Sequence, residues 1–369
     1  MSFEALFPGC PRHVPSHRDQ EWLYSIDELA VSPTQRISRW SRDQHLLNRP
    51  TLATAPRVQV LSVYEEAAMK GKACVFIDRI SARLKLPETM AYQAKVLVHR
   101  FYARQPLQFH PFYEVAAGLV FVVLKLGEIP GARGVKNLLS AASSIAAKQH
   151  VPENSAEWVR WRSAVLFYES YGLAVIGFDT SVALPHHPLL VMLAWWYPRA
   201  AAAFADPPTA RIEDVDVAER AAYLTLLRHA ASYAAQALHT TLPLRCHAFE
   251  MAGAALWCAM ITVDLGLRLG TCDVGTAPSD GGATANDPEV WRWPAPACAA
   301  SAVWRGTRLR NFLESWDLDP AWLPVWAEEI MVSRHDAAYR RFLEHLFTPS
   351  NDESEHPPRE IASAVSATE

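Results

Sequence analysis

Residues 90–128, MAYQAKVLVHRFYARQPLQFHPFYEVAAGLVFVVLKLGE, decide the fold of this chain. Within them, residues 115–124 carry no charge and are bracketed by Glu114 and Lys125. A membrane span would need about 20 such residues, so this shorter run predicts a helix at the centre of a helical domain. Lys125 and Glu128 are spaced i, i+3 and share one face of the last turn. A buried helix that ends in two charges indicates a binding site at its tip.

The same unit occurs a second time in the chain. LQFHPFYE, residues 107–114, precedes the first apolar run, and LRCHAFE, residues 244–250, precedes a second run that ends at Asp264. Apolar residues with helical spacing also precede each copy. An internal duplication explains this repetition, and it predicts two related all-helical domains.

The composition agrees with an all-α fold. The chain has 369 residues, half of them apolar, with 15 glycines and 26 prolines, and it contains no convincing period-two alternation. For the first domain we predict five helices: 64–84, 87–102, 113–126, 133–147 and 156–176.

We divide the chain into five parts by composition and pattern. These are an N-terminal extension, partly disordered (1–57), a first helical domain (58–188), a second (189–270), a linker with C-terminal helices (271–345) and a disordered tail (346–369).

Several classes of function are disfavoured. The net charge of −4 and a pI near 6.4 give no global attraction for nucleic acid or an anionic membrane. The six cysteines are scattered, the amino terminus has no apolar signal core, and no segment is long enough to cross a bilayer, so we expect an intracellular soluble protein.

The sequence offers no catalytic or cofactor motif. It has no Walker-type loop, no GxGxxG, no GxSxG and no HExxH. His186-His187 and Cys246-His247 lack a second ligand pair at a zinc spacing. We therefore expect no metal, no cofactor and no enzymatic activity. The pattern is that of an interaction protein.

A series of motifs then resembles one family. HRFY at 99–102 and KLGEIP at 125–130 resemble the first cyclin box. Residues 22–36 are similar to the entry of the cyclins that serve transcription, residues 158–179 to the closing helix of that box, and residues 238–244 to the entry of the second box. The resemblance is to cyclins K and T and their fungal relatives. It implies two tandem five-helix cyclin boxes with an N-terminal extension and a C-terminal helical appendage.

The resemblance also implies a kinase-binding site. By position, Lys125 and Glu169 match the family's pair that grips the αC region of a cyclin-dependent kinase, with Glu128 beside them. Phe178 and Phe121 are the apolar neighbours expected to bury kinase side chains.

Two positions differ from the family pattern, which has a glutamate where this chain has Gly127 and an arginine where it has Lys70.

The expected function is that of a nuclear regulatory subunit that forms a heterodimer with a cyclin-dependent kinase of the transcriptional type. That kinase is expected to act on the C-terminal repeat domain of RNA polymerase II. Transcription machinery is a further partner class, whereas direct nucleic-acid or membrane contact is not expected. The alternatives are a role like that of cyclin C or L, a cyclin-fold scaffold without a kinase, and a general transcription factor like factor IIB.

Overall fold

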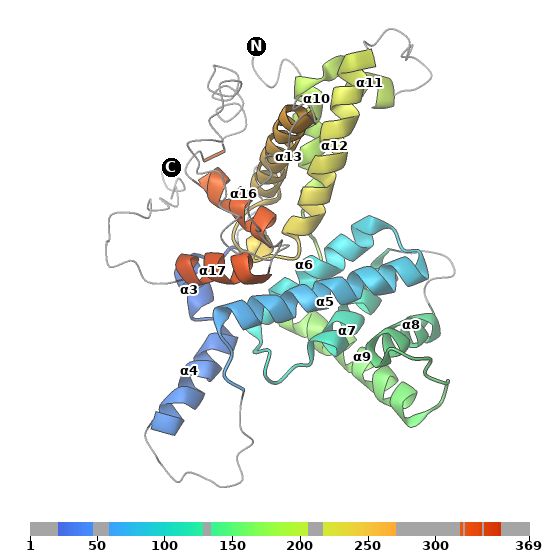
Figure 1. Ribbon diagram of the computed structural model, residues 1–369. Coiled ribbons are helices and arrows are strands. Elements are labelled where there is room, and N and C mark those ends of the chain that lie inside the picture. Colours follow the sequence, from blue (N-terminus) through green and yellow to red (C-terminus); the bar gives the residue numbers. More distant parts are fainter. Residues whose placement is uncertain are drawn as a thin grey trace, which may run out of the picture.

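The computed structural model describes residues 21–46, 59–127, 134–205, 217–270, 318–319, 322–333 and 336–347. Within these ranges the chain forms helices and no strand, which confirms the all-α prediction. Figure 1 shows two groups of helices stacked end to end, with the first N-terminal helices and the last C-terminal helices along one side.

The first group contains the five predicted helices. They are α5 (Val63–Leu84), α6 (Glu88–Arg104), α7 (Phe112–Leu126), α8 (Val135–Ala147) and α9 (Ala156–Val175). Two of them begin at a serine that caps free backbone N–H groups. Ser62 forms a reciprocal capping box with Glu65, and Ser155 accepts from the backbone N–H of Trp158.

Helix α7 is the centre of the first core, as its apolar run predicts. Every residue from 115 to 124 is buried, and α5, α6, α8 and α9 all pack on it. Because the helix is covered on all sides, only its two ends reach solvent.

The second group repeats this plan around α13 (Ala248–Gly270). Helices α10 (His186–Trp196), α11 (Pro198–Ala205) and α12 (Val217–Ala237) surround it, together with the short 3₁₀ helix η2 (Leu242–Leu244) and α16 (Trp322–Val332). The second core thus draws on α16, which lies in the segment that we assigned to the C-terminal appendage by sequence.

The N-terminal residues pack on the first core. Helices α3 (Ile26–Ala30) and α4 (Pro33–Leu46) lead into it. Lys70, one of the two departures from the family pattern, is buried and pairs with Glu66 at 2.6 Å. Glu66 also accepts from Ser32 and Gln35, at 2.9 Å each, so this buried pair holds α4 against α5.

A partly exposed ionic network connects the two helical groups. On α6, Lys95 Nζ lies 2.7 Å from Asp78 Oδ1 of α5, and Asp78 Oδ2 lies 3.1 Å from Nε2 of His239, which follows α12. Within the second group, the buried Arg245, which follows η2, pairs with Glu329 of α16. Helix α17 (Asp336–Leu346) then returns to the first group and packs on α5.

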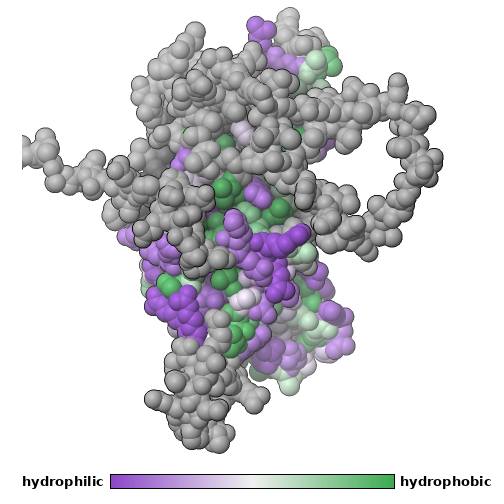
Figure 2. Space-filling view, turned by 60° about the vertical axis from the view of Figure 1, so that its left-hand side comes forward, coloured by the Kyte–Doolittle hydropathy of each residue, from purple (hydrophilic) through white to green (hydrophobic). Residues whose placement is uncertain are grey.

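The exposed surface is mixed in character. Figure 2 shows hydrophilic side chains predominating over the described lower part of one face, with apolar ones between them. None of the described helices combines the length and apolarity that a membrane span requires.

Candidate functional site

The predicted charged pair is present at the tip of α7. Lys125, in the last turn of α7, forms an ion pair with Glu169 of α9. The side chain of Lys125 is 54% exposed and that of Glu169 is 18% exposed. Such a pair contributes about 0–1 kcal/mol to folding, so fold stability is a weak reason for its presence. An ammonium has three donors and a carboxylate two acceptor oxygens, which leaves capacity for a partner's backbone.

Two glycines bring α7 and α9 close enough to form this pair. A Cβ added to Gly118 would lie 2.5 Å from Cβ of Tyr168, the residue before Glu169. A Cβ added to Gly172 would lie 3.0 Å from a methyl carbon of Leu119. Because neither position has room for a side chain, the glycines set the separation of the two helices and therefore the position of the pair.

A second ion pair joins the same two helices. Glu114, in the first turn of α7, pairs with Arg160 of α9, with exposures of 17% and 53%. It matches the Lys125–Glu169 pair in exposure but lies at the opposite end of α7, and Arg160 also pairs with Glu157 at 2.8 Å. It therefore serves as an internal comparison.

Two apolar residues near Lys125, Phe121 and Leu126, differ in their exposure to solvent. Phe121, which the resemblance assigns to the binding surface, is only 5% exposed, and Lys125 Nζ lies 4.5 Å above its ring centroid. Phe121 therefore supports the ammonium from below through a cation–π contact. Leu126 is 49% exposed and presents apolar surface beside the pair instead.

Gly127, the other departure from the family pattern, leaves space that Met90 fills. A Cβ added at Gly127 would lie 1.6 Å from Cε of Met90. A glutamate at this position would displace the end of that flexible side chain. The predicted site residue Glu128 lies outside the described residues.

Phe178 stands apart from the pair, in the turn that ends α9. Gly177 and Phe178 have φ of 64° and 57°, and the Phe178 N–H donates to the Leu173 carbonyl at 2.8 Å. A left-handed conformation costs a non-glycine residue roughly 1–2 kcal/mol. The Phe178 side chain is nevertheless 71% exposed, so it does not repay this cost by packing within the chain. Strained backbone that displays an aromatic ring is typical of a functional contact.

An anchor beneath the turn holds it in place. Trp22 Nε1 donates to Asp179 Oδ2 at 2.7 Å, and Arg100 donates to the same oxygen at 3.2 Å and to the Ser181 carbonyl at 2.8 Å. Arg104 stacks over the Trp22 ring at 4.0 Å. In the sequence, Trp22 was noted only as the first residue of the segment 22–36. Two sequence features could have indicated that Trp22 helps to hold this turn: it begins the segment that resembles the entry of the family, and Arg100 belongs to the HRFY motif.

Two histidines, His186 from the pair considered as metal ligands and His99 from the HRFY motif, make contacts inside the fold. His186 stacks on Tyr92 with ring centroids 4.3 Å apart, and burial lowers its pKa. The HRFY histidine, His99, donates from Nε2 to the Leu238 carbonyl at 3.0 Å, and burial lowers its pKa to about 3. Among the residues that the structure describes, no cluster of three or more possible metal ligands occurs.

Comparison with known proteins finds similarity to several cyclins. No family model matches the chain. Cyclin pch1 of Schizosaccharomyces pombe is 32% identical over 158 residues, which cover 42% of this chain and 44% of that protein. Cyclin-T1-5 of Arabidopsis thaliana is 24% identical over 164 residues, covering 42% and 27%. Cyclin-T of Drosophila melanogaster is 23% identical over 174 residues, covering 47% and 13%.

The chain is similar to Cyclin pch1 and to cyclins of the T type over less than half of its own length. It spans less than half of the length of each of these three relatives. Its fold is similar to that of a chain in the CAK complex of Chaetomium thermophilum bound to ATP-gamma-S, with a TM-score of 0.51 and 15% identity over 94% of this chain and 88% of that one. The cyclin relationship and the all-α cyclin fold therefore agree with the resemblance in the sequence.

Proposed function

We propose that this chain is the regulatory subunit of a cyclin-dependent kinase and that it binds the kinase through Lys125, Glu169, Leu126 and Phe178. The observation that carries this proposal is the Lys125–Glu169 pair, which is accessible at the tip of the central helix and contributes little to folding. The cyclin relationship supports the same assignment. In this role the chain has no catalytic residues of its own.

The pair suits a segment of partner backbone. The ammonium of Lys125 can donate to carbonyl groups and the carboxylate of Glu169 can accept from N–H groups. When a partner covers them, both charges lose water but keep each other and gain backbone contacts. Removing either charge then leaves the other uncompensated in a buried interface, which typically costs 2–5 kcal/mol of binding free energy.

The apolar residues provide the remaining contact. Leu126 follows Lys125 at the end of α7, and Phe178 lies apart from the pair in the turn after α9. Large exposed apolar side chains of this kind are the usual anchors of an interface. By holding the αC region of the kinase inward, the chain lets the kinase form its Lys–Glu ion pair and order its activation loop.

We further propose that the kinase is of the transcriptional type, that it acts on the C-terminal repeat domain of RNA polymerase II, and that the heterodimer is nuclear. The support is the relationship to cyclins of the T type and to Cyclin pch1.

The test is co-purification from native cells. A tagged wild-type chain is expected to recover a protein kinase that phosphorylates a polymerase repeat peptide. The Lys125→Ala/Glu169→Ala variant is expected to lose it, with affinity lower by about 30-fold or more, because the kinase backbone groups that the pair would bind are left unpaired in the interface. The matched control is Glu114→Ala/Arg160→Ala, which removes an ion pair of equal exposure from the same two helices.

Three outcomes would contradict the proposal. Recovery of no kinase would favour a cyclin-fold scaffold or a DNA-side factor like factor IIB. Equal recovery with the Lys125/Glu169 variant would place the kinase contact elsewhere on the chain. If the recovered kinase were inactive on the repeat peptide, the regulatory role would stand, but the polymerase repeat would be excluded as the kinase substrate.

A further inference from the structure

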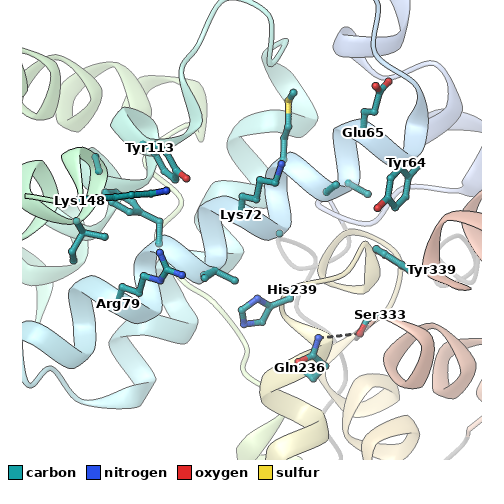
Figure 3. A pocket seen from close by; sticks show the side chains of 18 residues that line it. Tyr64, Glu65, Lys72, Arg79, Tyr113, Lys148, Gln236, His239, Ser333 and Tyr339 are labelled. Atoms are coloured by element: carbon teal, nitrogen blue, oxygen red, sulfur yellow. Dashed lines mark hydrogen bonds between the residues drawn. The ribbon is translucent and has the colours of Figure 1, made fainter. Parts of the chain in front are cut away.

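A large cavity lies on the outer side of α5. It has a volume of about 680 Å³ and is lined by residues of α5, the end of α8, the end of α12 and the segment after α16. Figure 3 shows Lys72 and Arg79 rising from α5, Lys148 from the end of α8, and Gln236 and His239 from the α12 side. The cavity shares no residue with the proposed kinase contact among the described residues. Its size is within the range of ordinary ligand sites.

Three cations line this cavity without an anionic partner. Lys72, Arg79 and Lys148 are all exposed, and none of them forms an ion pair with another described residue. Some exposed cations elsewhere on this acidic chain are paired, as Lys136 is with Glu153 at 2.9 Å. Three unpaired cations at one cavity form a local positive site on a chain with a net charge of −4.

The single carboxylate of the cavity does not neutralise them. Glu65 also lines the cavity, but its carboxylate is engaged at the start of α5, where it accepts from the Ser62 N–H at 2.8 Å. Glu65 and Arg79 are separated by about 21 Å of helix at 1.5 Å per residue. The end of the cavity formed by Arg79 and Lys148 is therefore electropositive.

The spacing of the cations suits an extended chain. Lys72 and Arg79 are at i, i+7 on α5, so they face the same side and lie about 10 Å apart along the helix axis. An extended peptide covers that distance in about three residues at 3.3 Å each. Between the two cations the floor is apolar, formed by Val75 and Phe76. Polar groups on the opposite wall, Gln236 and Ser333, are hydrogen-bonded to each other at 3.0 Å.

We propose that this cavity binds a phosphorylated segment of a partner protein. Lysine and arginine side chains form strong charge-assisted hydrogen bonds with phosphate, and arginine does so in a bidentate manner. The apolar floor would hold the residues between two phosphate groups. A long nucleic acid fits less well, because three cations on a chain of negative net charge would neutralise few of its phosphates. The site does not depend on whether the chain binds a kinase.

The test uses the full chain alone and fluorescence polarisation. The probe is a fluorescein-labelled peptide with two phosphoserines three positions apart, compared with the same peptide carrying serines. The wild-type chain is expected to bind the phosphorylated probe at least about tenfold more tightly than the serine form. The cavity variant is Lys72→Gln/Arg79→Gln/Lys148→Gly, and glycine is chosen because residue 148 has a φ of 55°.

The matched control variant is Arg83→Gln/Arg162→Gln/Arg228→Gln, which removes three exposed cations from outside the cavity that form no ion pair with another described residue. We expect the cavity variant to lose about tenfold in affinity and the control variant less than about twofold. Circular dichroism establishes that both variants are folded.

The proposal is overturned if the two peptides bind equally or if the cavity variant binds as wild type does. Equal losses in the two variants would also overturn it, because the attraction would then be a general charge effect. The proposal is also overturned if a single-stranded RNA of equal charge displaces the labelled probe more strongly than unlabelled phosphopeptide does, because the ligand would then be a nucleic acid.

Discussion

The close approach of α7 and α9 at Gly118 makes a strong prediction about the site. A Cβ at this position would lie 2.5 Å from Tyr168 Cβ and 2.9 Å from its carbonyl carbon. Neither atom belongs to the flexible end of a side chain, so Gly118→Ala must move the helices apart by nearly 1 Å to reach an ordinary contact. Overpacking of this kind costs up to about 3 kcal/mol, while alanine returns about 1 kcal/mol of helix propensity. The expected net loss of unfolding free energy is about 2 kcal/mol.

Gly71→Ala is the matched control for that substitution. Gly71 is also inside a helix, α5, but an added Cβ would lie 3.5 Å from the His239 carbonyl oxygen, which is an ordinary contact. This control is therefore expected to gain up to about 1 kcal/mol.

Urea unfolding followed by circular dichroism measures both free energies, and the affinity for the co-purified kinase measures the shift of Lys125 relative to Glu169. If Gly118→Ala were as stable as wild type and bound the kinase equally well, the argument that this glycine positions the pair would be refuted.

Three further predictions concern buried polar groups. Below its ordinary pKa of 6.5, His99 is protonated in the unfolded chain but stays neutral in the fold down to about pH 3, so the fold loses stability as pH falls through this window. Between pH 7 and pH 5 the loss is about 2 kcal/mol in urea titrations, and His99→Gln should remove it. Glu329→Ala removes the buried carboxylate that pairs with the buried Arg245 and is expected to lower the thermal unfolding free energy by about 3–5 kcal/mol, whereas an unchanged midpoint would contradict this. Trp22→Phe keeps the ring but loses the hydrogen bond to Asp179, so kinase affinity measured by titration should fall by about threefold to tenfold while the fold persists. Unchanged affinity would show that this anchor does not hold the turn.

The sequence predicted the helices of the first group because their patterns are local. The uncharged run before Lys125 depends on neighbouring residues alone, and the five helices begin and end close to the predicted positions. The second core was less accessible to prediction. Helix α16 packs against α13, although a long segment separates them in the sequence, and no periodicity links such distant residues.

In the candidate site, too, the sequence predicted what depends on neighbouring residues and not what depends on tertiary packing. Lys125 and Phe121 share a helix face by spacing, but only the packing of the core decides that Phe121 is buried and Leu126 exposed. The pairing of Lys125 with Glu169 came from the family resemblance. The strained turn at Phe178 had no sequence signal of its own, because a positive φ at phenylalanine arises from tertiary contacts.

The most direct test of the central claim is photo-cross-linking from position 178. Phe178 is replaced by p-benzoylphenylalanine, an aromatic residue of similar shape, and the tagged chain is irradiated in native cells. The matched control is the same replacement at Phe109, an exposed phenylalanine before the start of α7, about 20 Å from Lys125 along that helix. The account predicts a cross-link from position 178, but not from position 109, to the αC region of a protein kinase. A cross-link from position 178 to a protein other than a kinase, or to none, would contradict it.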